Sequence, residues 1–248
     1  LVGSEMCIRD RYWFYDFSVF LDNKNSIPKE GYFLEKGSDR FMIKLNQVSK
    51  NIRGQEILEN LNYEFRDGTI YGLCGPNGSG KTMILRMIAG LVFQTTGTIE
   101  INGEILHKTI SFPKRMGLII EHQEMLPDLT AYENLEYLAK IKKIASREDI
   151  LNSLQRVGLC SDKMVKKYSL GMKQRLNMAQ AIFEKPELIL LDEPTNALDQ
   201  EGIHLVHQIL REEKERGACI LIATHNEQDL NMICDKVLRV ADRKMEEL

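Results

Sequence analysis

The sequence has no long hydrophobic run. A helix that crosses a membrane needs roughly 20 consecutive apolar residues. The best apolar run here, residues 218–223, is much shorter and is typical of a buried strand. We therefore expect that this chain does not cross a membrane by itself.

An excess of charge of either sign is also absent. Lys and Arg total 33 and Asp and Glu total 36, for a formal net charge of -3. Nucleic-acid-binding domains carry a concentrated basic patch, and proteins of the membrane surface carry basic stretches, so we expect no nucleic-acid partner. The five cysteines are odd in number and no two have the spacing of metal ligands, which predicts reduced thiols.

The 248 residues suit one large domain or two small ones, but the first 41 positions differ from the rest and hold half of the aromatic residues. Within them, Met6–Asp10 resembles a translated transposon end of the kind used in sequencing libraries. Glu35–Ser38 can be encoded by DNA that resembles a ribosome-binding site, a few codons before Met42. Our hypothesis is that residues 1–41 are non-native or leader-derived and that one domain spans 42–248. The alternative is a genuine N-terminal extension.

From Met42 onward, apolar strands alternate with helical patterns, which predicts a three-layer α/β core. Asn102-Gly103 predicts a hairpin turn. Thr130, followed three residues later by Glu133, predicts a helix start with a capping box. A helical subdomain is expected at about 122–180. The expected strands lie at 43–48, 57–65, 70–74, 98–105, 116–120, 188–191 and 219–223, and further helices at 147–157 and 201–215.

Residues 75–82 match the pattern G-x-x-x-x-G-K-[ST] between an apolar strand and a helical pattern. Glycines let the backbone wrap around phosphate oxygens, and the helix N-terminus adds a partial positive charge. Lys81 can reach the β- and γ-phosphates, and the Thr82 hydroxyl can bind Mg²⁺. The predicted nucleotide-binding residues are Gly75, Pro76, Asn77, Gly78, Ser79, Gly80, Lys81, Thr82 and Met83.

Three further motifs follow in a fixed order. Ser169 and Gly171 lie at the start of a predicted helix, whose free N–H groups can meet a γ-phosphate. A buried strand ends in Asp192 and Glu193, at the edge where α/β sheets bind ligands. His225 follows the next strand. Each motif alone is compatible with an ordinary structural role, and it is their ordered combination with the phosphate loop that points to a function.

Residues 42 to about 245 resemble the nucleotide-binding subunits of ATP-binding cassette (ABC) transporters, and among them the bacterial antibiotic-export ATPases of the bacitracin type. The resemblance implies a P-loop NTPase core with an antiparallel β subdomain and a helical subdomain. It implies ATP hydrolysis with Mg²⁺, which Thr82 and Asp192 bind. It also implies that Glu193 deprotonates the attacking water, that His225 contacts the γ-phosphate, and that Lys81 binds the phosphates.

The same resemblance implies that one cassette does not make a complete site. A homo- or heterodimer would hold ATP between Lys81 of one subunit and Ser169 and Gly171 of the other. The pair would lie on the cytoplasmic, inner face of the cell membrane and drive a separate multi-span permease, as an exporter. The alternatives are an importer subunit, or a soluble ABC ATPase that acts on ribosomes or DNA.

The sequence departs from the family pattern in three places. The signature, usually Leu-Ser-Gly-Gly-Gln, is replaced by Tyr168–Met172. Glu121 replaces a glutamine and is expected to bind nucleotide and Mg²⁺, the alternative being an exposed loop acid. The family places an aromatic ring near residues 51–53, where this chain has none, and if Ile52 takes that place we expect weak base discrimination. His204 and His207, three residues apart on a predicted helix, are expected at the surface.

Overall fold

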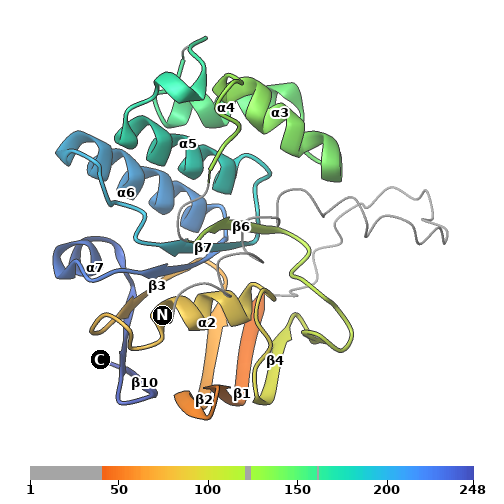
Figure 1. Cartoon of the computed structure of the whole chain (residues 1–248), viewed down its shortest axis with the longest axis vertical. Coiled ribbons are helices and arrows are strands. Elements are labelled where there is room, and N and C mark those ends of the chain that lie inside the picture. Colours follow the sequence, from red (N-terminus) through yellow and green to blue (C-terminus); the bar gives the residue numbers. More distant parts are fainter. Residues whose placement is uncertain (1–40, 121–123, 161) are drawn as a thin grey trace. The chain divides into compact units, whose positions relative to one another are not determined.

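The structure is a computed structural model that describes residues 41–120, 124–160 and 162–248. Its larger sheet has the strand order β10-β9-β3-β8-β7-β6, with every neighbouring pair parallel except β9 and β10 (Figure 1). Parallel neighbours need crossover connections, which is why helices cover this sheet. The strands are β3 (Thr69–Cys74), β6 (Met116–Ile119), β7 (Leu188–Asp192), β8 (Cys219–Ala223), β9 (Lys236–Ala241) and β10 (Lys244–Glu247).

The second sheet is antiparallel, with the order β2-β1-β4-β5. The turn between β4 and β5 is formed by Asn102 and Gly103, whose φ angles are 50° and 80°. A type I′ turn requires this left-handed conformation at both central residues, and the predicted hairpin is confirmed. The strands are β1 (Met42–Ile52), β2 (Gln55–Arg66), β4 (Thr96–Ile101) and β5 (Glu104–Ile105).

Helices cover the two faces of the larger sheet, which gives the predicted three-layer α/β arrangement. Along β7, Ile189 and Leu191 face a core shared with α5 and α6, whereas Leu188 and Leu190 face a core shared with α2 and the antiparallel sheet (Figure 1). This burial on both sides explains the continuous apolar run of the strand. The helices are α2 (Lys81–Ile88), α3 (Ala131–Lys142), α4 (Arg147–Arg156), the 3₁₀ helix η2 (Val165–Lys167), α5 (Leu170–Ile182), α6 (Gln200–Glu215) and α7 (Glu227–Ile233).

Thr130 caps the start of α3 as the sequence predicts. Its hydroxyl accepts a hydrogen bond from the Glu133 N–H at 3.2 Å, and the Glu133 carboxylate accepts one from the Thr130 N–H at 2.7 Å. Thr130→Ala is expected to lower the free energy of unfolding by about 1 kcal/mol, because a helix donor loses its partner. Urea denaturation measures the change, with Thr130→Ser as the control that keeps the hydroxyl. Equal stability of the alanine and serine variants would contradict this role.

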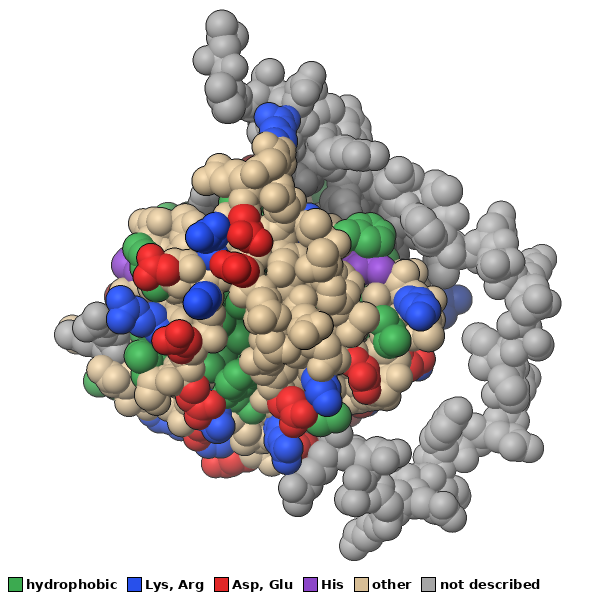
Figure 2. All heavy atoms as spheres, turned by 90° about the horizontal axis from the view of Figure 1, so that it is seen from below, with side chains coloured by type: hydrophobic (Ala, Val, Ile, Leu, Met, Phe, Trp, Pro, Cys, Tyr) green, Lys and Arg blue, Asp and Glu red, His purple; other side chains and the backbone are tan. Residues whose placement is uncertain are grey.

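Charged side chains of both signs are interspersed on the surface seen in Figure 2. Ion pairs link neighbouring strands, as between Lys44 of β1 and Glu64 of β2 at 3.7 Å, and Glu64 also pairs with Arg66 at 3.2 Å. This mixed surface agrees with the near-neutral net charge. None of the helices in the described ranges has both the length and the apolar character that a membrane span requires.

Candidate functional site

The phosphate loop lies between β3 and α2, and its glycines adopt conformations that other residues disfavour. Gly80 precedes α2 with a φ of 106°. Gly75 has a φ of 140°, and a Cβ there would lie 2.1 Å from the carbonyl oxygen of Val240 in β9. Glycine is therefore needed in this loop for two reasons: the backbone adopts positive φ angles, and a neighbouring strand packs too closely for a side chain.

Lys81 begins α2 and turns back over the loop. Its side chain is buried, and Nζ donates hydrogen bonds to the carbonyl oxygens of Gly75 at 2.7 Å and Pro76 at 3.1 Å. The ammonium is thereby held above the N-terminus of α2, where backbone N–H groups lack helical partners. Among the described residues, the buried Ser79 hydroxyl has no hydrogen-bond partner. These free donors and the positive charge suit the oxygens of a polyphosphate.

Thr82 and Asp192 come together from two elements that lie far apart in the sequence. The Thr82 hydroxyl donates a 2.7 Å hydrogen bond to Oδ2 of Asp192, at the end of β7. Magnesium is commonly bound through one or two protein oxygens, with phosphates and waters as the other ligands. The described part of the chain contains no cluster of three or more His, Cys, Asp or Glu side chains arranged for a metal. The Thr82–Asp192 oxygen pair suits Mg²⁺ delivered with a phosphate substrate.

Glu193 and His225 form a second polar pair at the same edge of the sheet. His225 Nδ1 lies 2.7 Å from Oε1 of Glu193, and the His225 backbone N–H donates to the same oxygen at 3.1 Å. The other carboxylate oxygen of Glu193 accepts a 3.0 Å hydrogen bond from the hydroxyl of Thr224. Glu193 has a φ of 49°, which turns the chain sharply at the end of β7. The pair is therefore oriented by three hydrogen bonds and remains open to solvent on the His225 side.

Ser169 and Gly171 lie at the start of α5, away from the phosphate loop. Ser169 caps α5 by accepting a 3.2 Å hydrogen bond from the N–H of Met172. Because α5 covers the face of the sheet opposite to α2, the described contacts do not join these residues to the phosphate loop (Figure 1). A Cβ on Gly171 would lie 3.2 Å from the carbonyl oxygen of Ala197, so the start of α5 adjoins the segment that follows Glu193.

The remaining site predictions have mixed outcomes. Glu121 lies outside the described residues. Ile52 ends β1 and is half-buried. His204 is exposed as expected, but the prediction for His207 is wrong, because its side chain is buried and bonded to Asp229.

The buried His207–Asp229 pair, with Thr195, is the polar feature that sequence reasoning missed. All three residues are buried. A signal did exist, because His207 lies next to Val206 and three residues before Leu210 on the apolar side of α6. Helical spacing alone would have placed it inside.

Comparison with known proteins agrees with this geometry. The family model described as ABC transporter matches residues 58–196. The chain is 55% identical over 207 residues to the uncharacterized ABC transporter ATP-binding protein YybJ of Bacillus subtilis (strain 168), covering 83% of this chain and 95% of that protein. It is 40% identical over 211 residues to the bacitracin transport ATP-binding protein BcrA of Bacillus licheniformis, covering 82% of this chain and 68% of that protein. A solved structure of an ATP-binding subunit of an ABC transporter superposes with a TM-score of 0.75 at 26% identity, covering 84% of this chain and 90% of that chain.

Proposed function

Because the chain belongs to the ABC transporter family of ATP-binding proteins, we propose that it is the ATP-hydrolysing motor of a multi-subunit membrane exporter. The observation that carries the proposal is the meeting of three groups at one edge of the sheet. These groups are the phosphate loop with Lys81, the Thr82–Asp192 oxygen pair, and the Glu193–His225 pair. Together they supply phosphate binding, a metal site and a base.

Each group has a distinct role in the proposed reaction. Lys81 and the loop N–H groups bind the phosphates of ATP. Thr82 and Asp192 would hold Mg²⁺, which neutralises charge on the phosphates when bound. Glu193 accepts a proton from water as the water oxygen bonds to the γ-phosphorus and the bond to the bridging oxygen of ADP breaks. His225 orients Glu193 through its 2.7 Å contact, and its exposed ring is proposed to contact the γ-phosphate.

Ser169 and Gly171 complete the proposed site only in a dimer. Their helix, α5, starts with free N–H groups that suit a γ-phosphate, yet it lies away from the phosphate loop of its own chain. A second cassette, identical or related, in head-to-tail arrangement would place this helix start against ATP bound by Lys81. Closing and reopening of the pair would then convert hydrolysis into movement.

The membrane partner is proposed to be a separate multi-span permease, with the cassette peripheral on the inner face of the cell membrane. The export direction rests on the similarity to the bacitracin transport protein BcrA. A decisive experiment first sequences the genes that flank this one, then co-expresses the chain with a multi-span protein found there and measures ATP hydrolysis in membrane vesicles. Hydrolysis that requires both proteins and is lost in Lys81→Ala supports the motor. Hydrolysis that is indifferent to every membrane protein, or solute uptake in place of export, would favour the soluble or the importer alternative.

The base of the nucleotide is proposed to meet Ile52 rather than an aromatic ring. We therefore expect similar KM values for ATP and GTP. Stacking of a base on an aromatic side chain is worth about 1–3 kcal/mol, so Ile52→Tyr should lower both KM values at least roughly fivefold. Steady-state kinetics with the two nucleotides measures this, and a strong preference of the wild type for ATP would count against the assignment.

A further inference from the structure

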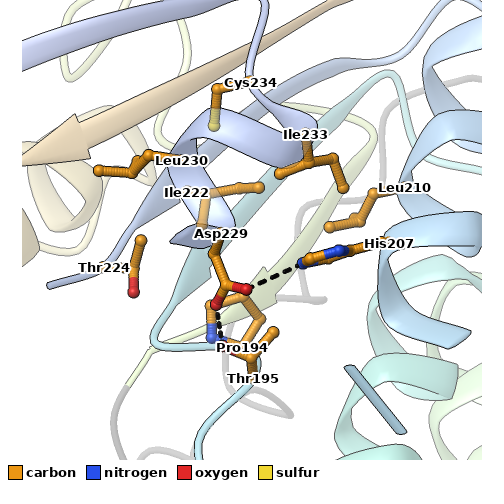
Figure 3. Close-up of a pocket in the computed structure, with 10 residues that line it drawn as sticks. All are labelled: Pro194, Thr195, His207, Leu210, Ile222, Thr224, Asp229, Leu230, Ile233 and Cys234. Carbon is orange, nitrogen blue, oxygen red and sulfur yellow. Dashed lines mark hydrogen bonds and ion pairs between the residues drawn. The ribbon is translucent and has the colours of Figure 1, made fainter. Parts of the chain in front are cut away.

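We propose that His207 is a positioning residue for ATP hydrolysis, which acts through Asp229 and Thr195 on the two segments that carry Glu193 and His225. The inference rests on the proposed function and goes beyond it. His207 lies on α6, Asp229 on α7 and Thr195 in the segment after β7. Figure 3 shows the three side chains converging from these elements on one pocket.

The carboxylate of Asp229 joins the other two side chains. Its Oδ2 accepts a 2.6 Å hydrogen bond from the Thr195 hydroxyl, and its Oδ1 lies 3.1 Å from Nε2 of His207. Because carboxylate oxygens accept hydrogen bonds, we assign the proton of this contact to Nε2. Each oxygen of Asp229 is therefore used once, by residues from two different elements.

Burial makes this network sensitive to the loss of any member. Thr195, His207 and Asp229 are 8%, 3% and 6% exposed. The rest of the pocket wall is largely apolar and includes Leu210 and Ile233 (Figure 3). Burial also lowers the pKa of His207, although the Asp229 carboxylate opposes the shift. A buried polar group that loses its hydrogen-bond partner destabilises a protein much more than an exposed one does. The complete network is therefore strongly favoured over one in which a member lacks its partner.

The network lies close to the proposed catalytic groups along the chain. Thr195 is two residues after Glu193, and Asp229 is four residues after His225. The backbone N–H of Asn226, the residue after His225, donates a hydrogen bond to the Thr224 hydroxyl. The Asp229–Thr195 bond thus ties together the two segments that must keep Glu193 and His225 in contact. His207 holds Asp229 from the side of α6 and prevents its carboxylate from turning away.

Two further contacts connect the network to the rest of the site. Leu230 of α7 packs against Gly72 of β3, where a Cβ would lie 2.4 Å from the Leu230 side chain, so α7 rests on the strand that leads into the phosphate loop. Gln174 of α5 donates a 2.9 Å hydrogen bond to the carbonyl oxygen of Pro194, the residue before Thr195. The segment that His207 steadies therefore also receives the helix of Ser169.

Paired variants of His207 test the inference in membrane vesicles that contain the chain together with its multi-span partner. His207→Leu removes the donor and keeps an apolar side chain. His207→Gln keeps an N–H at about the distance of Nε2. A misplacement of about 1 Å at a catalytic group can lower a rate by about 100-fold. We expect kcat of His207→Leu to fall about 10- to 100-fold with MgATP affinity within about twofold of wild type, and His207→Gln to recover most of the rate.

Three outcomes would overturn the inference while wild-type hydrolysis remains. They are an unchanged kcat in His207→Leu, an equal loss of kcat in His207→Leu and His207→Gln, or parallel losses of kcat and MgATP affinity. Absence of hydrolysis in the wild type overturns the proposed function and the inference with it.

Variants of Thr195 decide the matter if His207→Leu fails to fold. Thr195→Val has nearly the same shape but lacks the hydroxyl, and Thr195→Ser keeps it. We expect Thr195→Val to lower kcat with MgATP affinity preserved, and Thr195→Ser to retain most of the rate. Equal kcat values for these two variants would overturn the inference.

Discussion

Lys81→Ala is expected to weaken MgATP binding by about 10- to 100-fold, because a charge-assisted hydrogen bond is worth about 1.5–3 kcal/mol. The expected loss in kcat is larger, about 100- to 1,000-fold, since charge stabilisation in the transition state is removed as well. Isothermal titration with MgATP measures the first effect and a phosphate-release assay measures the second.

The substitution Lys81→Ala is also expected to affect the conformation of the phosphate loop. Lys81 Nζ bonds the carbonyl oxygens of Gly75 and Pro76, so alanine also removes two contacts that hold the loop. Melting temperature should therefore be measured beside binding. The matched control is Lys44→Ala on β1, whose lysine pairs with Glu64 on the surface. Binding of MgATP by Lys81→Ala at the affinity of this control would contradict the assignment of the phosphate loop.

Glu193→Gln is expected to bind MgATP almost normally and to hydrolyse it about 100- to 10,000-fold more slowly, the usual contribution of a general base. The amide has the shape of the carboxylate and can still accept the His225 N–H, so the turn after β7 should persist. Because proton removal fails after binding, the variant should accumulate as an ATP-bound dimer. Single-turnover kinetics and light scattering with MgATP measure the two effects.

A surface glutamate provides the control for this variant. Glu187 lies just before β7 and pairs with Arg115 at the surface, so Glu187→Gln changes the charge by the same amount away from the site. This control should hydrolyse ATP at the wild-type rate. Normal turnover in Glu193→Gln would show that another group is the base, whereas slow turnover in both variants would point to a general effect of charge.

Features with a local physical cause could be read from the sequence. The Asn102-Gly103 turn follows from the ease with which these residues adopt positive φ. The Thr130–Glu133 capping box needs only residues three apart. The phosphate loop is also local, since its glycines, its lysine and its helix start are contiguous. Strand β7 was recognisable because burial on both faces leaves no polar alternation.

Long-range pairings required the tertiary structure. The sequence did not predict β9, β10 or α7, because β9 joins the larger sheet beside β3, a strand distant in the chain. The fit of Gly75 against the Val240 carbonyl likewise depends on that neighbour. The pairing of Thr82 with Asp192 was expected only through resemblance to a family, since nothing in the spacing of the two residues brings them together.

The sequence by itself therefore determined that this chain binds nucleotide phosphates on an α/β core, because the groups responsible are neighbours along the chain or repeat with a regular period. Only the tertiary structure decided how the remaining polar groups are used. His207 shows the difference, since its position beside Val206 and Leu210 indicated the apolar side of α6, but only the packing of α7 supplies Asp229 as its buried partner. A histidine at the surface and a buried histidine that contacts a carboxylate differ only in what packs against them.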